Sequence, residues 1–375
     1  MKILMVDQIA KVNYKYSFSL AEAVRRQGNE VVLAIDCKEE KEKCSCRLWN
    51  LFNTDEKNVG KVKKLLNYIS SYRAIYKELK SGDYDIIHTQ WLIFSPVDYF
   101  FLHKIVKKCK VKLIVTIHDI LPFNQKFYDF RYHKKIYKLA DRVIVQAENN
   151  VQRFRELFPE MAGKETMIPH GHFLDYAEPL EMKEARNHLD IREEALVFLF
   201  FGQIKKVKGV GVLLEAFSKM CRDYPDALLV IAGSVWKDDF SQYQEIIDRT
   251  GISGQVRTDI RYIPDEEVKY YYSACDCCAL PYLDVYQSGV IQLCYAYRKP
   301  VVATAIGAFK EVVLDGESGF LCEPDNAEDL AAVMRKAIEK KDCFEQMGSR
   351  GYDYIAQKFS WERIADRVNS LYSEN

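Results

Sequence analysis

Three lysines follow a short apolar run in the middle of the chain, and their spacing points to phosphate chemistry. Residues 198–201 read FLFF, Gly202 follows, and the next loop carries Lys205, Lys206 and Lys208 before an apolar pattern of helical spacing begins. A strand, a glycine turn and a helix start in succession can bind a phosphorylated ligand, because the first turn of a helix offers unpaired N–H groups and the positive end of its dipole. The lysines would add positive charge. The alternative interpretation is a crossover loop with solvated lysines.

Histidines end two other strand-like runs. His88 closes residues 85–88, and His118 with Asp119 follows residues 111–117. In a doubly wound parallel sheet, ligands bind beyond the carboxyl ends of the strands, and a cleft between two such sheets would collect the loops there. This rule selects the loops at His88, His118, Gly202, Gly233 and Tyr282.

The elements that must position these residues alternate between strand and helix, which predicts α/β architecture with parallel sheets and right-handed crossovers. The strands expected are residues 2–6, 31–35, 85–88, 111–117, 142–146, 196–201, 227–232, 256–262, 277–280 and 300–303. The helices expected are residues 18–27, 59–80, 96–108, 130–139, 212–221, 242–249, 265–274, 289–297, 327–339 and 361–372. The helix at 59–80 is expected to place Val62, Leu65, Leu66, Ile69, Tyr72 and Tyr76 on one apolar side.

Length and composition predict two globular domains. The chain has 375 residues, and a single hydrophobic core usually supports about 250 to 300. Apolar residues make up 48% of the sequence and aromatic residues 13%, which is enough for two packed cores and argues against disorder. The periodicity lapses between about residues 171 and 195, where a linker is expected.

The net charge of zero hides an asymmetry between the two halves. Residues 1–180 carry 30 Lys+Arg and 22 Asp+Glu, a surplus of 30 − 22 = +8, so the remainder carries 24 against 32. A basic first half favours an anionic partner, either a lipid surface or a phosphorylated acceptor, over nucleic acid. The basic stretches 57–80, 104–112 and 131–138 would suit a lipid-linked diphosphate saccharide at the membrane, and solvated helix faces are the alternative.

The cysteines predict neither a metal centre nor a disulfide framework. Their number, eleven, is odd, and neither Cys44-x-Cys46 nor Cys275-x-Cys277-Cys278 has paired CxxC spacing. We therefore expect a reduced, intracellular protein. The first residues show no cleavage-site pattern, and no apolar segment approaches the ~18 residues that span a bilayer. The expected location is cytoplasmic, with peripheral attachment to the inner face of the cell membrane as an option.

Several collinear motifs resemble the family 4 retaining glycosyltransferases of GT-B fold over essentially the whole chain. They are TIHD at 116–119, IPHG at 168–171, FGQIKKVKG at 201–209, IAG at 231–233, YIPDEEVKYYYSACDCCALPY at 262–282, KPVVAT at 299–304 and DGESGFL at 315–321. The closing FSWERIADRV at 359–368 resembles the terminal helix that crosses back onto the first domain.

The resemblance implies two Rossmann-like domains that face a cleft, an acceptor domain at 1–175 and a donor domain at 176–357, with residues 358–375 returning to the first domain. It also implies transfer of a sugar from a nucleotide diphosphate donor, with retention at the anomeric carbon and without a bound metal or other cofactor. Without a divalent ion, protein charge must stabilise the departing diphosphate.

On this resemblance Lys208 matches the lysine of the family's KG motif and is expected to contact the diphosphate. Gln203 stands where a basic residue is usual, so Lys205 would supply part of the missing charge; Gly202 completes the turn. His118 matches the histidine that contacts the donor sugar near the reacting centre. We expect it to position and stabilise groups rather than to act as a strong base. A lone histidine of structural role is the alternative.

The chain departs from the family at its two conserved glutamates, because no carboxylate occurs between Asp284 and Glu311. Gln287, Ser288, Gly289 and Val290 occupy that place, which resembles a subgroup of the family with SGV there. Ser288 is a natural N-cap and Gly289 allows close backbone approach, so this turn is expected to bind phosphate. A degenerate site that no longer binds donor is the alternative.

The remaining family positions concern sugar and acceptor. Glu311 matches an acidic loop residue that could bind donor sugar hydroxyls, or it could cap the next helix. The acceptor side is expected to include Asn13, Tyr14, His88, Trp91 and Asp119. Core packing is an equal alternative for His88 and Trp91. His170 replaces the usual asparagine and is expected near the domain junction.

The resulting expectation is a hexosyltransferase that acts on a saccharide or lipid-linked acceptor in cell-surface polysaccharide synthesis. A GDP-mannose donor is slightly preferred to a UDP sugar. Two alternatives stay open: a degenerate nucleotide-binding or scaffold protein without turnover, and a nucleotide-sugar epimerase or hydrolase, which would consume donor without acceptor.

Overall fold

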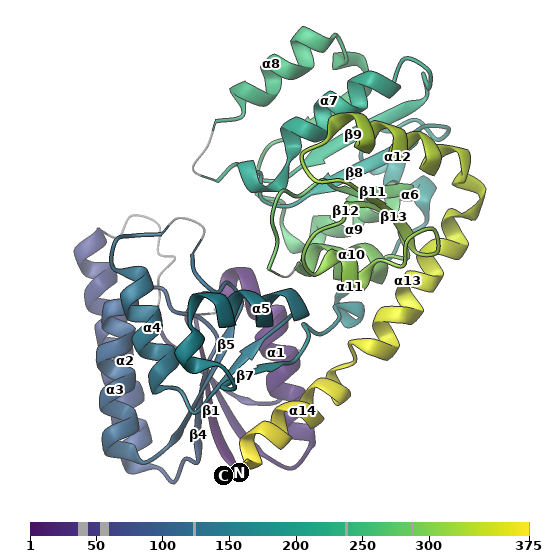
Figure 1. Ribbon diagram of the computed structural model, residues 1–375. Coiled ribbons are helices and arrows are strands. Elements are labelled where there is room, and N and C mark those ends of the chain that lie inside the picture. Colours follow the sequence, from purple (N-terminus) through teal and green to yellow (C-terminus); the bar gives the residue numbers. More distant parts are fainter. Residues whose placement is uncertain (37–43, 53–59, 123–124, 237–238, 287, 375) are drawn as a thin grey trace. The chain divides into compact units, whose positions relative to one another are not determined.

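The chain forms two compact units. The computed structural model describes residues 1–36, 44–52, 60–122, 125–236, 239–286 and 288–374, with the backbone alone for residues 10–13. The first unit comprises Met1–Gly171 together with Phe359–Asn375, and the second comprises His172–Lys358. Figure 1 shows that each unit contains its own sheet with helices packed around it.

The first unit contains a seven-stranded parallel sheet of order β3-β2-β1-β4-β5-β6-β7. Its strands are β1 (Lys2–Asp7), β2 (Glu30–Ile35), β3 (Arg47–Asn50), β4 (Ile86–Thr89), β5 (Lys112–Ile117), β6 (Arg142–Val145) and β7 (Glu165–Met167). The interior strand β1 is buried on both faces, since Ile3, Leu4 and Met5 are each fully buried. Uniformly apolar strands of this kind need helices on both sides of the sheet.

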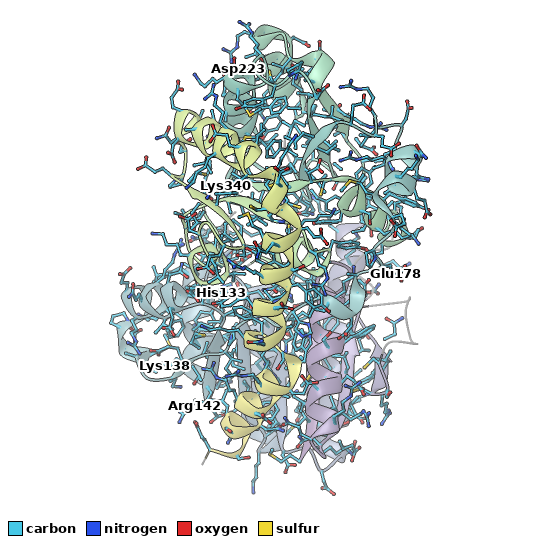
Figure 2. The ribbon with its side chains drawn as sticks, turned by 90° about the vertical axis from the view of Figure 1, so that its right-hand side faces the viewer. His133, Lys138, Arg142, Glu178, Asp223 and Lys340 are labelled. Atoms are coloured by element: carbon cyan, nitrogen blue, oxygen red, sulfur yellow. The ribbon has the colours of Figure 1, made fainter. Side chains whose placement is uncertain are left out.

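Helices α1 (Ala10–Arg26), α2 (Lys61–Ser81), α3 (Ser95–Cys109), α4 (Asp129–Leu139) and α5 (Glu148–Leu157) belong to this unit. Helix α14 (Trp361–Ser373) returns to it from the end of the chain and packs along α1, as Figure 2 shows in yellow and purple. The ring of Trp361 covers Gly171 so closely that a Cβ there would lie 2.4 Å from it. Glycine at this position is therefore part of the docking of α14.

The second unit contains a six-stranded parallel sheet of order β10-β9-β8-β11-β12-β13. Its strands are β8 (Leu196–Phe201), β9 (Ala227–Ala232), β10 (Val256–Asp259), β11 (Cys277–Leu280), β12 (Val301–Thr304) and β13 (Gly319–Cys322). Its helices are α6 (Met182–His188), α7 (Val210–Met220), α8 (Ser241–Thr250), α9 (Asp265–Ala274), α10 (Gly289–Ala296), α11 (Phe309–Val312), α12 (Ala327–Glu339) and α13 (Phe344–Lys358). The predicted α/β class with two doubly wound parallel sheets is confirmed.

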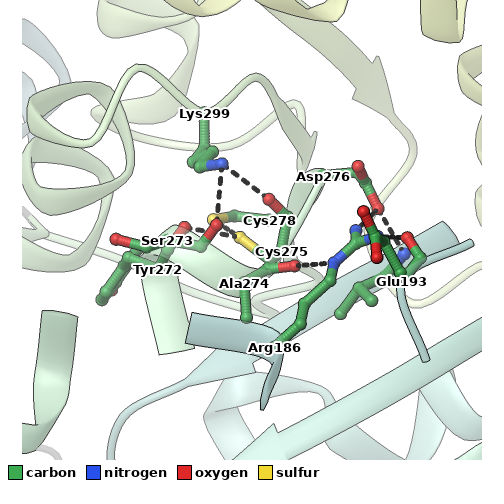
Figure 3. A network of polar contacts seen from close by, with 10 residues as sticks. Arg186, Glu193, Tyr272, Ser273, Ala274, Cys275, Asp276, Cys278 and Lys299 are labelled. Atoms are coloured by element: carbon green, nitrogen blue, oxygen red, sulfur yellow. Dashed lines mark hydrogen bonds and ion pairs between the residues drawn. The ribbon is translucent and has the colours of Figure 1, made fainter. Parts of the chain in front are cut away.

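A buried ion pair fastens the amino-terminal edge of the second sheet. Arg186 is 4% exposed; its guanidinium donates to Asp276 Oδ2 at 2.8 Å and to the Ala274 carbonyl at 3.0 Å. The same Asp276 oxygen accepts from the Val197 N–H at 2.6 Å. Lys299 donates beside it to the Cys275 carbonyl, as Figure 3 shows. Because every partner in this network is hydrogen-bonded, loss of one member would leave a buried charge uncompensated.

Several predicted element boundaries were wrong. Helix α1 begins at Ala10, eight residues before the predicted start, so Asn13 and Tyr14 lie on a helix rather than on a loop. Helix α2 buries Tyr68, Ser71, Tyr72, Ile75 and Leu79. The predicted apolar side holds only in part, because Val62 and Leu66 are 73% and 59% exposed. Among the described residues no helix combines the length and the apolar character that crossing a bilayer requires.

Candidate functional site

The carboxyl edge of the second sheet brings the predicted donor residues into one neighbourhood. Strand β8 ends at Phe201 and strand β11, its neighbour in the sheet, ends just before Pro281 and Tyr282. The Lys208 ammonium lies over the ring of Tyr282, 3.6 Å from its centroid. A cation over an aromatic face is attracted by the ring quadrupole. The ring therefore holds this lysine at the strand ends.

The start of helix α10 lies beside this lysine and its aromatic partner. Ser288 is buried at the N-cap of α10 and lies close to the Tyr282 hydroxyl, whose pKa is raised by burial and lowered less by Ser288. A Cβ placed on Gly202 would lie 3.6 Å from a methyl of Val290, so the β8 turn and the first turn of α10 are neighbours. An α-helix start here supplies backbone N–H donors next to the lysine.

Two glycines allow backbones to touch at this edge. Gly209 has φ +68°, and a Cβ on it would lie 1.9 Å from the carbonyl oxygen of Pro281. Gly233 has φ +147°, and a Cβ on it would lie 1.9 Å from the carbonyl oxygen of Gly202. No side chain fits at either distance. The close contacts hold the lysine loop against the end of β11 and the β8 turn against the end of β9.

The other predicted donor residues lie around this neighbourhood. Lys205 places its ammonium 5.3 Å from the ring centroid of Trp236, and Gln203 is half-buried directly after the turn. Glu311 lies on the short helix α11, where its backbone carbonyl accepts from Tyr354 at 3.0 Å. Gln287 is outside the described residues.

His118 is buried at the carboxyl edge of the first sheet. Its ring stacks on Trp91 at 4.7 Å and 16°, and the edge of Tyr16 meets it at 4.9 Å. Its Nε2 lies 3.4 Å from Oε1 of Gln90. Burial holds the pKa of the His118 imidazole well below its usual range, and the neighbouring His170 lowers it further. His118 is thus neutral at pH 7, which fits a positioning group better than a cation.

His88 belongs to the packed interior behind this group. It is fully buried, with Nδ1 2.6 Å from the Tyr372 hydroxyl on α14 and Nε2 2.7 Å from the Thr116 hydroxyl on β5. These contacts join β4, β5 and the terminal helix. Burial lowers the pKa of His88 to about 3. The geometry matches the core-packing alternative for His88. Trp91 differs, because it stacks on His118 at the strand ends.

Other acceptor-side predictions have a less direct placement. Tyr14 is half-buried on α1, with its ring edge-on to Phe18, and Asp119 is half-buried directly after His118. The side chain of Asn13 lies outside the described part of α1. His170 is buried against Tyr16, and burial lowers the pKa of His170 to about 4.

Sequence reasoning missed Tyr16 as a neighbour of His118, and it grouped Gln90 with His88 and Trp91 rather than with His118. Tyr16 lies on α1, about a hundred residues away along the chain, and only the fold brings its ring to His118. Gln90 directly follows β4, so its place two residues beyond His88 was the one available signal.

Acid sensitivity of the first unit should follow from its buried neutral histidines. The unfolded chain takes up a proton on each histidine below about pH 6.5, whereas folded His88 stays neutral down to about pH 3. The free energy of unfolding therefore falls as the pH falls, and His88 alone should contribute a loss of about 2 kcal/mol between pH 7 and pH 5. Between pH 7 and pH 5 the free energy of unfolding of His88→Asn should therefore fall by about 2 kcal/mol less than that of the wild type. Urea unfolding at the two pH values measures this difference.

The buried Asp98 carboxyl acts in the opposite direction, because burial raises its pKa to about 6, but it is common to both proteins. Equal pH dependence in wild type and His88→Asn would contradict the assignment of a neutral buried imidazole.

Comparisons with known proteins agree with the division of the chain into two units. The family profile described as Glycosyltransferase Family 4 matches residues 15–175, and the one described as Glycosyl transferases group 1 matches residues 181–354. Together they span most of the chain. Each unit is a Rossmann-like α/β domain, as in the GT-B fold. The two profiles show that this chain belongs to the family 4, group 1 glycosyltransferases.

Individual relatives are distant. The chain is 24% identical over 325 residues to the D-inositol 3-phosphate glycosyltransferase of Streptosporangium roseum, which covers 83% of this chain and 74% of that protein. It is 26% identical over 310 residues to the enzyme of that name from Corynebacterium aurimucosum, covering 78% and 72%.

Solved structures show the same fold at lower identity. The sucrose-phosphate synthase of Thermosynechococcus elongatus superimposes with a TM-score of 0.79 at 20% identity, over 99% of this chain and 98% of that chain. Anabaena HepE in complex with UDP-glucose superimposes with a TM-score of 0.78 at 18% identity, over 100% and 99%. At these identities the likeness shows the fold alone.

Proposed function

We propose that this glycosyltransferase moves a hexose from a nucleotide diphosphate sugar to a saccharide or lipid-linked acceptor, with retention and without a metal ion, in cell-surface polysaccharide synthesis. The observation that carries the proposal is the Lys208 ammonium held over Tyr282 beside the start of α10. A fixed cation and helix N–H groups in one place can stabilise the negative charge that develops on a departing diphosphate.

The roles follow from the positions. Lys208, with Lys205 and the turns at Gly202 and Ser288–Val290, binds the diphosphate of the donor. Glu311 binds hydroxyls of the donor sugar. In this scheme the leaving phosphate oxygen takes the proton of the acceptor hydroxyl, so no strong protein base is required.

Neutral His118 orients the sugar, and Asp119, Trp91, Asn13 and Tyr14 are the acceptor-side candidates. A neutral imidazole can both donate and accept hydrogen bonds, so it can order sugar hydroxyls without adding charge near the reacting carbon. The buried His88 supports this edge of the sheet from behind.

Relatives support a nucleotide-sugar donor without fixing its base. HepE has been solved with UDP and with UDP-glucose, and the D-inositol 3-phosphate enzymes are glycosyltransferases by name. Both UDP-glucose and GDP-mannose are therefore the first donors to test.

The full-length protein should show a rise in melting temperature with one nucleotide diphosphate sugar and should release the nucleotide only when acceptor is added. The rate should not depend on added Mg²⁺ or Mn²⁺, and NMR of the product should show the anomeric configuration of the donor. Consumption of donor without acceptor would instead indicate an epimerase or hydrolase. Binding without turnover, or no binding to any donor, would indicate the degenerate protein.

A lipid-linked acceptor is supported by the surface of α2. Val62 and Leu66 are 73% and 59% exposed, and they alternate with Lys61, Lys63 and Lys64 on a helix end that has no acidic residue in its first turn. Apolar side chains among cations suit an anionic bilayer surface, where they enter the headgroup region while the lysines contact the lipid charges.

Vesicles with anionic phosphatidylglycerol should sediment the protein, vesicles of phosphatidylcholine should not, and salt should weaken the binding. Val62→Ser with Leu66→Ser should reduce sedimentation several-fold. Tyr262, an aromatic residue of the second unit, is 60% exposed, so Tyr262→Ser is the control and should leave sedimentation unchanged. Sedimentation without lipid preference or salt dependence would remove the membrane from the proposal.

A further inference from the structure

Two buried thiols and a carboxylate meet between α1 and the segment that enters β3. Cys44 and Cys46 lie one residue apart, are each 7% exposed, and directly precede Arg47, the first residue of the edge strand. Glu22 lies on α1. One ligand atom from each of Cys44, Cys46 and Glu22 lies within 4.8 Å of the other two.

The backbone holds this cluster together. The N–H of Ser45, between the two cysteines, donates to Glu22 Oε2 at 3.2 Å, so the cysteine segment is tied to the helix. Directly after it, Arg47 pairs with Val32 in the parallel register of β2 and β3. The cluster is therefore tied to α1 on one side and directly precedes β3 on the other, and its three ligand atoms already lie within 4.8 Å of one another.

The ligand groups themselves supply the negative charge that a divalent cation requires. Two thiolates and one carboxylate would bring three negative charges, and the neighbouring arginines offset part of that charge. Arg25 donates to Glu22 at 2.7 and 3.1 Å, and Arg26 donates to it at 3.2 Å, so the arginines fix the orientation of the carboxylate. Hydrogen bonds of this kind to a ligating carboxylate orient it and are a usual part of metal sites.

We propose that Cys44, Cys46 and Glu22 form a site for a thiophilic divalent cation of the Zn²⁺ class. Zn²⁺ accepts sulfur and carboxylate oxygen ligands in tetrahedral geometry, and three protein ligands leave the fourth position to solvent. On binding, each thiol releases its proton and forms one metal–sulfur bond, so two protons leave as the cation enters. The site would fasten β3 to α1, and it is independent of glycosyl transfer.

The cysteine spacing alone predicted no metal centre, because the third ligand is 22 residues away from Cys44 and comes from another element. This metal site is not part of the proposed glycosyl transfer. If the experiments show no metal binding, the proposed donor site is unaffected.

The test uses the full-length protein, reduced and stripped of metal by a chelator. Titration with Co²⁺ should give thiolate-to-cobalt charge-transfer absorption that saturates at one equivalent and is abolished by Zn²⁺. The double change Cys44→Ser and Cys46→Ser should remove the band, and Glu22→Gln should lower the affinity tenfold or more, in the range of about 10 to 100-fold found for groups that support a metal site. Cys109→Ser, on α3 of the same unit, should bind like wild type.

A second measurement needs no variant, in case the serine protein does not fold. Zn²⁺ should protect Cys44 and Cys46 of the wild type from iodoacetamide but not the exposed Cys343, as read by peptide mass spectrometry. The proposal would be overturned by the absence of a charge-transfer band in wild type or by an unchanged band in the double variant. It would also be overturned by equal alkylation with and without Zn²⁺, or by a Cys44–Cys46 disulfide in the reduced preparation.

Discussion

Replacing Lys208 with alanine should lower kcat/KM for sugar transfer by about 100-fold while leaving the protein folded. Removal of one donor to a developing oxyanion typically costs about 100 to 1,000-fold in rate, and a charge-assisted contact is the stronger kind. The side chain is half-buried over Tyr282 rather than part of the core, so its loss removes charge without opening a large cavity. The measurement is steady-state transfer with the donor identified by thermal shift.

Lys206 provides the matched control for this variant, because it lies two residues away on the same turn and is exposed. Lys206→Ala should retain transfer within about threefold, as expected for a solvated surface charge. Lys208→Arg should recover part of the activity, since charge returns with a different donor geometry. Equal transfer by Lys208→Ala and wild type would remove Lys208 from the site and leave the crossover-loop interpretation.

Replacing Gly209 with alanine should destabilise the second unit by about 3 kcal/mol or more and abolish donor binding. Two physical costs add: a left-handed backbone conformation, about 1 to 2 kcal/mol for a residue with Cβ, and overpacking, about 1 to 3 kcal/mol. The added Cβ would lie 1.9 Å from the Pro281 carbonyl, so the lysine turn must move away from the end of β11. Tyr282, which holds Lys208, follows Pro281 directly.

Gly251 separates the two costs. It has φ +71°, nearly the same as Gly209 at +68°, but nothing lies within 4 Å of the position of a Cβ on it. Gly251→Ala should therefore cost only about 1 kcal/mol, from backbone strain, and should keep donor binding. Urea unfolding and donor thermal shift measure both. Similar losses for the two variants would show that the contact with Pro281 does not matter.

The strands and the glycine turns were predictable from sequence because their signals are local. The run at residues 198–201, Gly202 and the leucine spacing after Gly209 correspond to β8, the turn and α7 as found. A strand buried on both faces needs a continuous apolar run, and glycine adopts the positive φ values found at such turns more readily than other residues. The placement of Lys208 at the strand ends followed from these rules.

Short elements and helix faces were not predictable in the same way. The edge strand β3 reads RLWN, with two exposed residues, and carries too little apolar pattern to be recognised. The predicted apolar side of α2 included Val62 and Leu66 near its start, but burial concentrates from Tyr68 onward. There Tyr68 and Tyr72 donate to the buried Asp98. The partners of α2 decide which side is buried, and these partners are distant in sequence.

The packing of the histidines shows a further limit. His88 lies near the end of β4 and His118 directly follows the neighbouring strand β5, so local spacing places both at the carboxyl edge of the first sheet. The structure separates them, because a tyrosine from the last helix, Tyr372, takes up His88, whereas His118 meets Trp91 and Tyr16. Contacts that span nearly three hundred residues leave no trace in local spacing.

A crystal structure with UDP or GDP bound tests the central claim most directly. The account predicts diphosphate oxygens within about 3 Å of the Lys208 ammonium and of backbone N–H groups at the start of α10, next to Ser288. A nucleotide bound with its phosphates away from both Lys208 and Ser288 would contradict it.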